Sequence, residues 1–263
     1  MKAVFLDIDG VMQAHGDQDR FEHIEEFVDL SKRLTKELNN GFDYYKFGGD
    51  YYEGTHRSAP AAQYDIAAVY YDWRPNVVER LRHILDSTGA KIVLSSDWRE
   101  KGLDNMRGLL DIQGLGKYLY PTAPFCVPYG KPFMKENYSE EQLHTMFSET
   151  QTMFQKIDEK MRELYPGPPE KWLDHYDTRT SEIREYLDRH REIDAYVAID
   201  DRTLSRGLDG HFVKTYCYIK EEHVQQALEI LNRQDGPYPL PDEIKTDKLE
   251  EWRRKWVYDS KFY

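Results

Sequence analysis

Three short apolar runs lie far apart in this chain, and each of them ends in polar residues. They are Phe5-Leu6-Asp7-Ile8-Asp9-Gly10-Val11, Ile92-Val93-Leu94-Ser95-Ser96 and Val197-Ala198-Ile199-Asp200-Asp201. Short apolar runs of this kind are typical of fully buried strands. Because the carboxyl ends of parallel strands converge on one crevice, we expect four carboxylates and a hydroxyl group to meet at one edge of a sheet.

Such a group of carboxylates indicates a cation. Closely packed carboxylates repel one another and raise their own pKa values unless a positive charge neutralises them, which favours a hard divalent ion and, in first place, Mg²⁺. A calcium loop of the EF-hand type that begins at Asp7 is excluded. Its fifth and sixth positions would need an oxygen ligand and glycine, but Val11 and Met12 stand there.

Composition limits the classes of protein that this chain can belong to. A net charge of -12 argues against broad affinity for nucleic acid, although it leaves a local basic groove open. No apolar run approaches the roughly 20 residues that cross a bilayer, and the amino terminus does not resemble a secretory signal. We therefore expect a cytoplasmic protein without a membrane span. Cys126 and Cys217 are too few for a disulfide framework, and we expect both to be buried thiols in a reducing compartment.

The periodicity of apolar residues predicts strands that alternate with helices. We expect helices at residues 21–38, 75–88, 103–110, 180–190 and 221–231, and strands at 2–6, 90–94, 195–199 and 212–216, with an extended piece at 118–122. Residues 39–72 are rich in Gly and Tyr, which predicts irregular structure or short strands. A long polar helix at 139–164 and an amphipathic helix at 242–257 complete the prediction. The order indicates an α/β fold with a central parallel sheet that helices cover on both faces.

In sequence order, the three runs resemble the motifs of the haloacid dehalogenase-like (HAD) superfamily of phosphohydrolases and phosphotransferases. More narrowly, Ser95-Ser96-Asp97-Trp98-Arg99, Arg179-Thr180-Ser181-Glu182-Ile183 and Ile199-Asp200-Asp201-Arg202 resemble the HAD domains of RNA-repair proteins and the 3′-phosphatase half of polynucleotide kinase/phosphatase enzymes. The resemblance implies one HAD-like domain over residues 1–263 with a Rossmann-like core. It also implies cap-type insertions at about 16–70 and 125–177, which would exclude water and select substrates.

The resemblance also implies roles for the first motif. Asp7 would be the nucleophile that attacks phosphorus and forms an aspartyl-phosphate. Asp9 would be the general acid and base, and its backbone carbonyl would reach the metal. Gly10 would give the phosphate-binding turn its room. Mg²⁺ would be held by Asp7 together with Asp200 or Asp201, and the sequence leaves open which of the two binds directly.

The other motifs would bind the transferring phosphoryl group. The Ser95 hydroxyl and the Ser96 amide would donate hydrogen bonds to it. Arg179 occupies the place of the cation that the family usually supplies before the next core helix, and a guanidinium can grip two phosphoryl oxygens at once. Arg184 and either Lys131 or Lys135 are its rivals for this role.

Several residues near these motifs have two interpretations. Trp98 and Arg99 would either shape the mouth of the site or pack as structural residues. Arg202 would contact a substrate phosphate or an acid next to it. The tyrosines between Tyr44 and Tyr71 would stack on an unpaired base or pack in the core.

Together these features predict a Mg²⁺-dependent phosphatase whose substrate is a phosphorylated small molecule, such as a nucleotide, or a phosphorylated nucleic-acid end. Three alternatives remain open. They are transfer of the phosphoryl group to an acceptor other than water, carbon-halogen hydrolysis, and a catalytically silent module that binds a phosphorylated ligand or a protein partner. The sequence does not indicate an oligomeric state.

Overall fold

A computed structural model describes residues 1–16, 18–50, 61–124, 178–204, 207–208 and 210–233. Its centre is a four-stranded sheet in the order β2-β1-β3-β4, and every neighbouring pair of strands is parallel. The strands are β1 (Lys2–Leu6), β2 (Lys91–Leu94), β3 (Ala195–Asp200) and β4 (Phe212–Lys214). The predicted parallel sheet with flanking helices is confirmed. A parallel bridge between Ile92 and Leu119 places the predicted extended piece beside β2.

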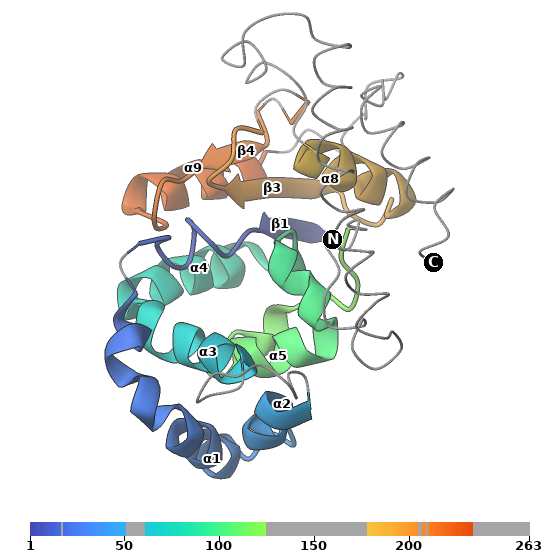
Figure 1. Cartoon of the computed structure of the whole chain (residues 1–263). Helices are drawn as coiled ribbons and strands as arrows, with labels where there is room; N and C mark the ends of the chain where they lie inside the picture. The colour runs from blue at the N-terminus through green and yellow to red at the C-terminus, as the bar shows by residue number, and fades with distance from the viewer. Residues whose placement is uncertain (17, 51–60, 125–177, 205–206, 209, 234–263) are drawn as a thin grey trace, which may run out of the picture.

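Helices cover both faces of the sheet, as alternation of side chains along β1 requires (Figure 1). Val4 and Leu6 belong to the larger core, which includes the apolar faces of α4 (Pro75–Thr88), α5 (Leu103–Asp111) and α9 (Glu221–Leu231). Ala3 and Phe5 point to the other face and pack against α8 (Thr178–Arg189). In Figure 1, α8 lies above β1, and α4 and α5 lie below it. Because both faces are buried, the central strands β1 and β2 are apolar after their first residue, and β3 carries no charged residue before Asp200.

Helices also build most of the described part of the first insertion, which corrects the prediction for residues 39–72. The elements here are η1 (Asp19–Glu26), α1 (Phe27–Leu38), α2 (Tyr44–Asp50), α3 (Ala61–Ala67) and the single π-helical turn η2 (Ala68–Asp72). The predicted helix at 21–38 is divided, because His23 leaves the helical region of backbone angles and separates η1 into two parts. Apolar residues of α1, α2 and α3 join the same core as α4 and α5, so this insertion thickens one layer of the fold.

The tyrosines of this insertion mostly pack. Tyr44 is fully buried, and its hydroxyl donates a hydrogen bond of 2.7 Å to the carbonyl of Gly108 on α5. Tyr64 meets the ring of Phe27 edge to face, and Tyr71 stacks on His23. Tertiary contacts of this kind form helices where the apolar periodicity of the sequence is weak.

Three smaller outcomes complete the comparison with the sequence. Cys217 is exposed, so the prediction that it is a buried thiol is wrong. Cys126 and the predicted helices at 139–164 and 242–257 lie outside the described residues. Within the described part of the chain, no helix combines the length and the apolar character that a membrane crossing needs.

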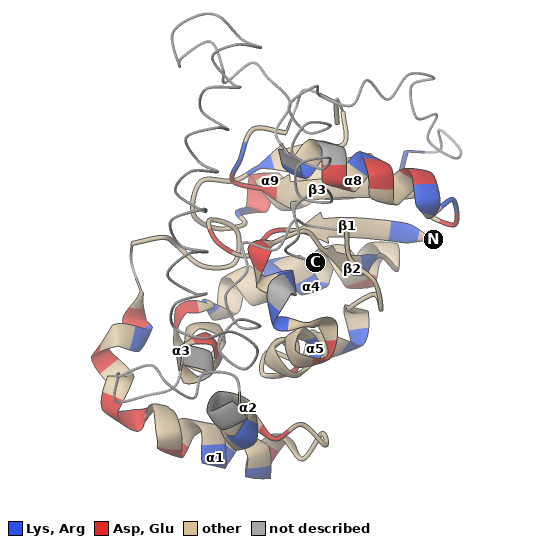
Figure 2. Cartoon of the chain, turned by 45° about the vertical axis from the view of Figure 1, so that its right-hand side comes forward, with Lys and Arg blue, Asp and Glu red and all other residues tan. Residues whose placement is uncertain are grey.

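Charges of both signs are mixed on the helix surfaces. Figure 2 shows Asp and Glu beside Lys and Arg along α1 and α8. The local basic groove that the net charge left open is therefore not present as a uniformly basic face on either helix.

Candidate active site

The carboxyl ends of the three motif strands meet at one edge of the sheet. Backbone hydrogen bonds hold them in register: the Asp7 amide donates to the Ile199 carbonyl at 3.1 Å, and the Ser95 amide donates to the Leu6 carbonyl at 2.9 Å. Strand β1 has its neighbour β2 on one side and β3 on the other, so the crevice beyond its end is a topological switch point, where open α/β sheets bind ligands.

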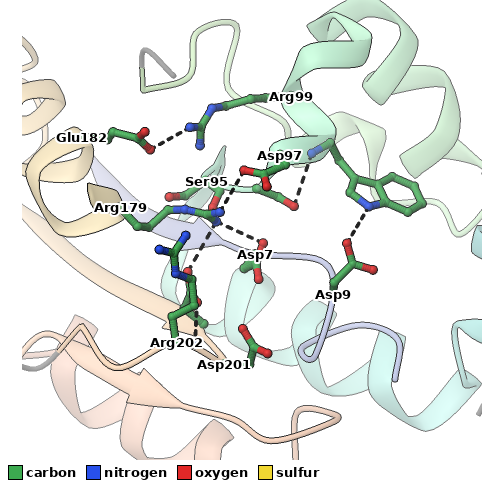
Figure 3. A network of polar contacts seen from close by, with 12 residues as sticks. Asp7, Asp9, Ser95, Asp97, Arg99, Arg179, Glu182, Asp201 and Arg202 are labelled. Atoms are coloured by element: carbon green, nitrogen blue, oxygen red, sulfur yellow. Dashed lines mark hydrogen bonds and ion pairs between the residues drawn. The ribbon is translucent and has the colours of Figure 1, made fainter. Parts of the chain in front are cut away.

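Three of the four motif carboxylates form a compact cluster in this crevice, and Figure 3 labels two of them, Asp7 and Asp201. One oxygen atom from each of Asp7, Asp200 and Asp201 can be chosen so that all three lie within 4.8 Å of one another. Asp7 and Asp200 are buried, whereas Asp201 is partly exposed. The outer Asp201 also contacts Nε2 of His15 at 2.8 Å through its Oδ2. The convergence that the sequence predicted is therefore present, with Asp200 deeper in the crevice than Asp201.

Burial makes the negative charge of this cluster costly. It raises the pKa of Asp7, an effect that the nearby Arg179 charge and a hydrogen bond from the Ser96 side chain oppose. Burial and then repulsion from Asp7 raise the pKa of Asp200 to about 7. Asp200 therefore keeps its proton to a higher pH than a free carboxyl group does.

Arg179 brings a guanidinium into contact with two carboxylates of the cluster. Its side chain is 4% exposed and extends from the first turn of α8. Nη1 lies 3.1 Å from Oδ1 of Asp7 and 3.5 Å from Oδ2 of Asp200, and it donates to the carbonyl of Ser95. Nη2 lies 3.1 Å from the exposed carboxylate of Asp97. The guanidinium of Arg179 therefore contacts three carboxylates at once.

The sequence offered other candidates for the phosphate-binding cation. Arg184 is buried on α8, whereas Lys131 and Lys135 lie outside the described residues. The contacts of Arg179 with Asp7 and Asp200 make it the strongest candidate for the phosphate-binding cation.

Ser95 and Ser96 differ in what their side chains do. The Ser95 hydroxyl oxygen is buried and has no hydrogen-bond partner among the described residues. A buried hydroxyl without a partner is unfavourable by about 1–3 kcal/mol, so the Ser95 hydroxyl is available to donate a hydrogen bond to a bound group. The Ser96 hydroxyl oxygen instead accepts a hydrogen bond of 3.4 Å from the Trp98 amide and caps η3 (Asp97–Lys101).

The side chain of Asp9 lies apart from the three-carboxylate cluster. Its Oδ2 accepts a hydrogen bond of 2.9 Å from the indole Nε1 of Trp98, and its Oδ1 accepts one of 2.7 Å from Nε2 of Gln13. If Asp9 contributes to a metal site, it does so through its backbone carbonyl, as the family resemblance implies. Trp98 therefore fits both interpretations that the sequence allowed. It packs in the core, with 8% of its surface exposed, and its ring nitrogen faces the site.

The cluster is suited to a hard divalent cation. Its donors are carboxylate oxygens, which Mg²⁺ prefers, and burial disfavours their charged forms, so a bound cation would stabilise the ionised cluster. Asp7, Asp200 and Asp201 would hold such an ion. The structure distinguishes Asp200 and Asp201 by depth but does not decide between them, since both offer an oxygen to the cluster.

Gly10 allows the turn after β1 to pass close to Asp201. Its φ is +75°, and a Cβ atom there would lie 2.5 Å from Oδ2 and 2.6 Å from Cβ of Asp201. Its amide donates to the carbonyl of Gln13 at 2.7 Å, and its carbonyl accepts from the Thr215 hydroxyl at 2.7 Å. These bonds hold the turn, so Gly10 shapes the site through its missing side chain.

Gly10→Ala is expected to weaken Mg²⁺ binding by about tenfold or more, because Asp201 must move away from the new methyl group and metal sites tolerate little displacement of their ligands. Gly89→Ala is the matched control. Gly89 has a similar φ of +69°, but its Cβ would meet no atom within 4 Å. Both variants should lose about 1–2 kcal/mol of stability from the left-handed backbone. Isothermal titration with Mg²⁺ and urea unfolding measure the two effects, and equal Mg²⁺ affinity in both variants would contradict this account.

The outer part of the site contains a partly buried ion pair. Nη2 of Arg99 lies 2.7 Å from Oε2 of Glu182 on α8, while Nε and Nη1 of Arg99 are buried without a partner among the described residues. The amide of Arg202 donates to Oδ1 of Asp200 at 2.8 Å, which closes the turn after β3. Arg99 thus joins η3 to α8, and the backbone of Arg202 orients a carboxylate of the cluster (Figure 3).

Sequence reasoning singled out Trp98 but did not find Gln13 and Trp73, the other members of the hydrogen-bond chain at Asp9. Trp73 donates through its indole Nε1 to Oε1 of Gln13 at 3.1 Å, and Gln13 in turn contacts Asp9. Neither the position of Gln13, four residues after Asp9, nor that of Trp73, just before α4, forms a recognisable motif. The only signal was the position of Gln13 within the turn that follows the first motif.

Comparisons with known proteins agree with this geometry. A search of the curated proteins found no match, and neither did a search of the solved structures. A family model described as the HAD domain in Swiss Army Knife RNA repair proteins matches residues 3–120 and 134–224. That match spans more than half of the chain and includes all the motif residues, and HAD domains of this kind are phosphohydrolases or carry out related chemistry. The chain therefore belongs to the family of HAD domains found in Swiss Army Knife RNA repair proteins.

Proposed function

We propose that this protein is a Mg²⁺-dependent phosphatase that works through an aspartyl-phosphate on Asp7. The observation that carries the proposal is the buried cluster of Asp7, Asp200 and Asp201, with the unpartnered Ser95 hydroxyl on the neighbouring strand. Carboxylates to hold a metal, one of them suited to attack, and a free donor for a phosphoryl oxygen are the parts that phosphoryl transfer needs.

Asp7 is the proposed nucleophile. It follows the central strand β1 directly, and its amide belongs to the sheet ladder, so its backbone is held rigidly. One carboxylate oxygen is held by Arg179 at 3.1 Å. Asp7 forms a bond to phosphorus as the bond to the leaving oxygen breaks, and water then hydrolyses the acyl phosphate.

Mg²⁺ bound by Asp7 and by Asp200 or Asp201, with the Asp9 backbone carbonyl as a further ligand, would supply charge neutralisation and polarise a phosphoryl oxygen. The residues themselves provide the rest. The Ser95 hydroxyl and the Ser96 amide donate to the equatorial oxygens, and Arg179 balances the negative charge that develops on them. Asp9 protonates the leaving oxygen in the first step and takes a proton from water in the second.

The substrate that we propose is a nucleotide or the phosphorylated end of a nucleic acid. The family to which the chain belongs is named for RNA repair proteins, which supports this class. The mixed charges on α1 and α8 favour recognition of a single phosphorylated end over binding along a backbone (Figure 2).

Phosphate release from p-nitrophenyl phosphate, a mononucleotide and a 3′-phosphorylated oligonucleotide tests the proposal. We expect turnover with Mg²⁺, a fall to background when excess EDTA removes the ion, and recovery when Mg²⁺ is restored. Because Asp7 and Asp200 repel each other without a cation, the ion should be required at neutral pH. Turnover that persists in excess EDTA would contradict the metal-dependent mechanism.

The same assay distinguishes the alternatives. Equal inactivity on the mononucleotide and the oligonucleotide, with activity on the aryl phosphate, would contradict the proposed substrate class but not the chemistry. Release of the alcohol without release of inorganic phosphate would indicate transfer to another acceptor. Ligand binding by calorimetry without any turnover would support a catalytically silent module.

A further inference from the structure

We propose that Trp98 and Gln13 are positioning residues that hold the Asp9 carboxyl group in the orientation from which it transfers a proton. The inference rests on the proposed function, since it concerns how Asp9 performs its step. It adds to that function two residues whose contribution to the reaction is made entirely through Asp9.

The geometry shows one donor for each oxygen of Asp9. Trp98 Nε1 donates to Oδ2 at 2.9 Å, and Gln13 Nε2 donates to Oδ1 at 2.7 Å. Both distances lie in the range of good hydrogen bonds, and both donors come from neutral side chains. Two donors on opposite oxygens fix the plane of a carboxyl group, which a single donor would leave free to rotate.

Each donor is itself held in place. Gln13 uses its other amide atom, Oε1, to accept the indole N–H of Trp73 at 3.1 Å, which fixes the orientation of the amide. Trp73 is 2% exposed and belongs to the core. Gln13 is therefore buried with its donor directed at Asp9, an arrangement in which outer residues orient the reacting group.

Trp98 is held from the other side. Its backbone amide lies 3.4 Å from the Ser96 hydroxyl oxygen, and the Lys101 ammonium lies 4.8 Å from its ring centroid. Lys101 forms an ion pair of 3.1 Å with Asp65. The segment from Ser95 to Trp98 therefore carries both the proposed phosphate-binding serines and a hydrogen-bond donor for Asp9. The position of the phosphoryl group and that of the proton donor are thus fixed by the same segment, between Ser95 and Asp9 in Figure 3.

This arrangement suits the first step of the reaction. As the phosphorus–oxygen bond to the leaving group breaks and the bond to Asp7 forms, the proton of Asp9 passes to the leaving oxygen. Asp9 becomes a negatively charged carboxylate as it loses the proton. The N–H groups of Trp98 and Gln13 already face its two oxygens, so they stabilise this charge without any rearrangement. Removal of either donor should therefore hinder proton transfer more than it hinders binding.

Dependence on the leaving group tests the inference. Trp98→Phe removes the indole N–H while keeping an aromatic ring, and we expect kcat/KM for an alkyl phosphate to fall by about 100-fold, the effect of a small misplacement of a reacting group. For p-nitrophenyl phosphate, whose leaving group departs readily as an anion, we expect a fall of about threefold or less, since its cleavage needs little help from an acid. A purely structural role for Trp98 would lower both values by the same factor.

Matched variants complete the experiment. Tyr118→Phe also removes an aromatic donor to a carboxylate, that of Asp86, but it lies beside the opposite end of β2 and should leave both substrates unaffected. Gln13→Met removes the second donor with little change in volume, and it should reproduce the selective loss even if Trp98→Phe fails to fold.

Two outcomes separate this inference from the proposed function. If wild-type protein shows Mg²⁺-dependent turnover but both variants lose activity equally on the two substrates, or lose none, the positioning role is wrong and the phosphatase remains. If wild-type protein shows no turnover on either substrate, the proposed function itself is wrong.

Discussion

Replacement of Asp7 by Asn is expected to lower the rate of phosphate release by about 10⁴-fold or more, the scale of effect seen when a nucleophile is removed from an enzyme that forms a covalent intermediate. Asn has nearly the shape of Asp but lacks the electron-rich oxygen that would attack phosphorus. Rapid quenching of wild-type protein with substrate labelled in its phosphoryl group should trap a hydroxylamine-sensitive phosphoprotein, and the Asp7→Asn variant should trap none.

The same variant should not be destabilised. Burial raises the pKa of Asp7, which means that its charged form is unfavourable in the folded protein without metal. Loss of this charge relieves repulsion with Asp200, so the midpoint of thermal unfolding in EDTA should stay the same or rise. Such a result would show that the variant loses activity without losing its fold. Active-site residues often lower the stability of the folded protein, so their replacement often raises it.

Asp86→Asn provides the control for removal of a carboxylate. Asp86 accepts a hydrogen bond from Tyr118 near the amino-terminal end of β2, away from the crevice at the carboxyl ends of the strands, and its variant should keep wild-type turnover. An Asp7→Asn protein with turnover within tenfold of wild type would contradict the nucleophilic role, since about 1.4 kcal/mol is too small for a lost nucleophile.

The metal-free protein is expected to lose stability as the pH rises from about 4 to about 7, and Asp200 should be a main cause. Its pKa is about 7 in the folded protein, compared with 3.8 for the free group. Between these values the folded state holds a proton that the unfolded state has released. The unfolded state therefore binds fewer protons, and the free energy of unfolding decreases with pH. The contribution of Asp200 is on the order of 4 kcal/mol, is fully present below the lower value and is lost above the upper one.

Urea unfolding in EDTA across this range measures the effect, and the Asp200→Asn variant isolates it. Other partly buried acids with raised pKa values, among them Asp65 and Glu182, contribute in the same direction, so the informative quantity is the difference between wild type and variant. The variant should become more stable relative to wild type as the pH rises toward 7, because its neutral amide mimics the protonated carboxyl group and does not ionise. A difference that does not change with pH would contradict the raised pKa.

Mg²⁺ should reverse this trend. The ion binds the ionised carboxylates, so its stabilising effect should grow between about pH 5 and about pH 8 and should be small at the acidic end. In the Asp200→Asn variant this growth should be much reduced. The ion and the proton therefore compete for the same buried group, which links the stability of the fold to the proposed chemistry.

The parts of the fold that follow from the sequence are those that depend on local pattern. The runs that end at Asp7, Ser95 and Asp200 predict strands, and parallel strands bring their carboxyl ends together, so the cluster was predictable from residues far apart in the chain. Helix α4 was equally clear, because Pro75 begins it and Gly89 ends it.

The parts that the sequence did not predict depend on tertiary contacts. Helices α2 and α3 form in a segment rich in Gly and Tyr, where buried groups such as the Tyr44 hydroxyl find partners only on distant elements. The chain of hydrogen bonds from Trp73 through Gln13 to Asp9 likewise joins residues whose types and spacing indicate nothing by themselves. Side-chain networks of this kind become visible only when the backbone is in place.

The apolar character of both faces of β1 has a consequence for how this enzyme family can vary. Val4 and Leu6 on one side and Ala3 and Phe5 on the other are all buried. A shift of the strand by one position would therefore still place apolar side chains on both buried faces. Such a slip would nevertheless turn residue 7 to the opposite side of the sheet. We therefore expect this strand to tolerate exchanges among apolar residues of similar volume, whereas an insertion or deletion within it should abolish activity because it misdirects the aspartate.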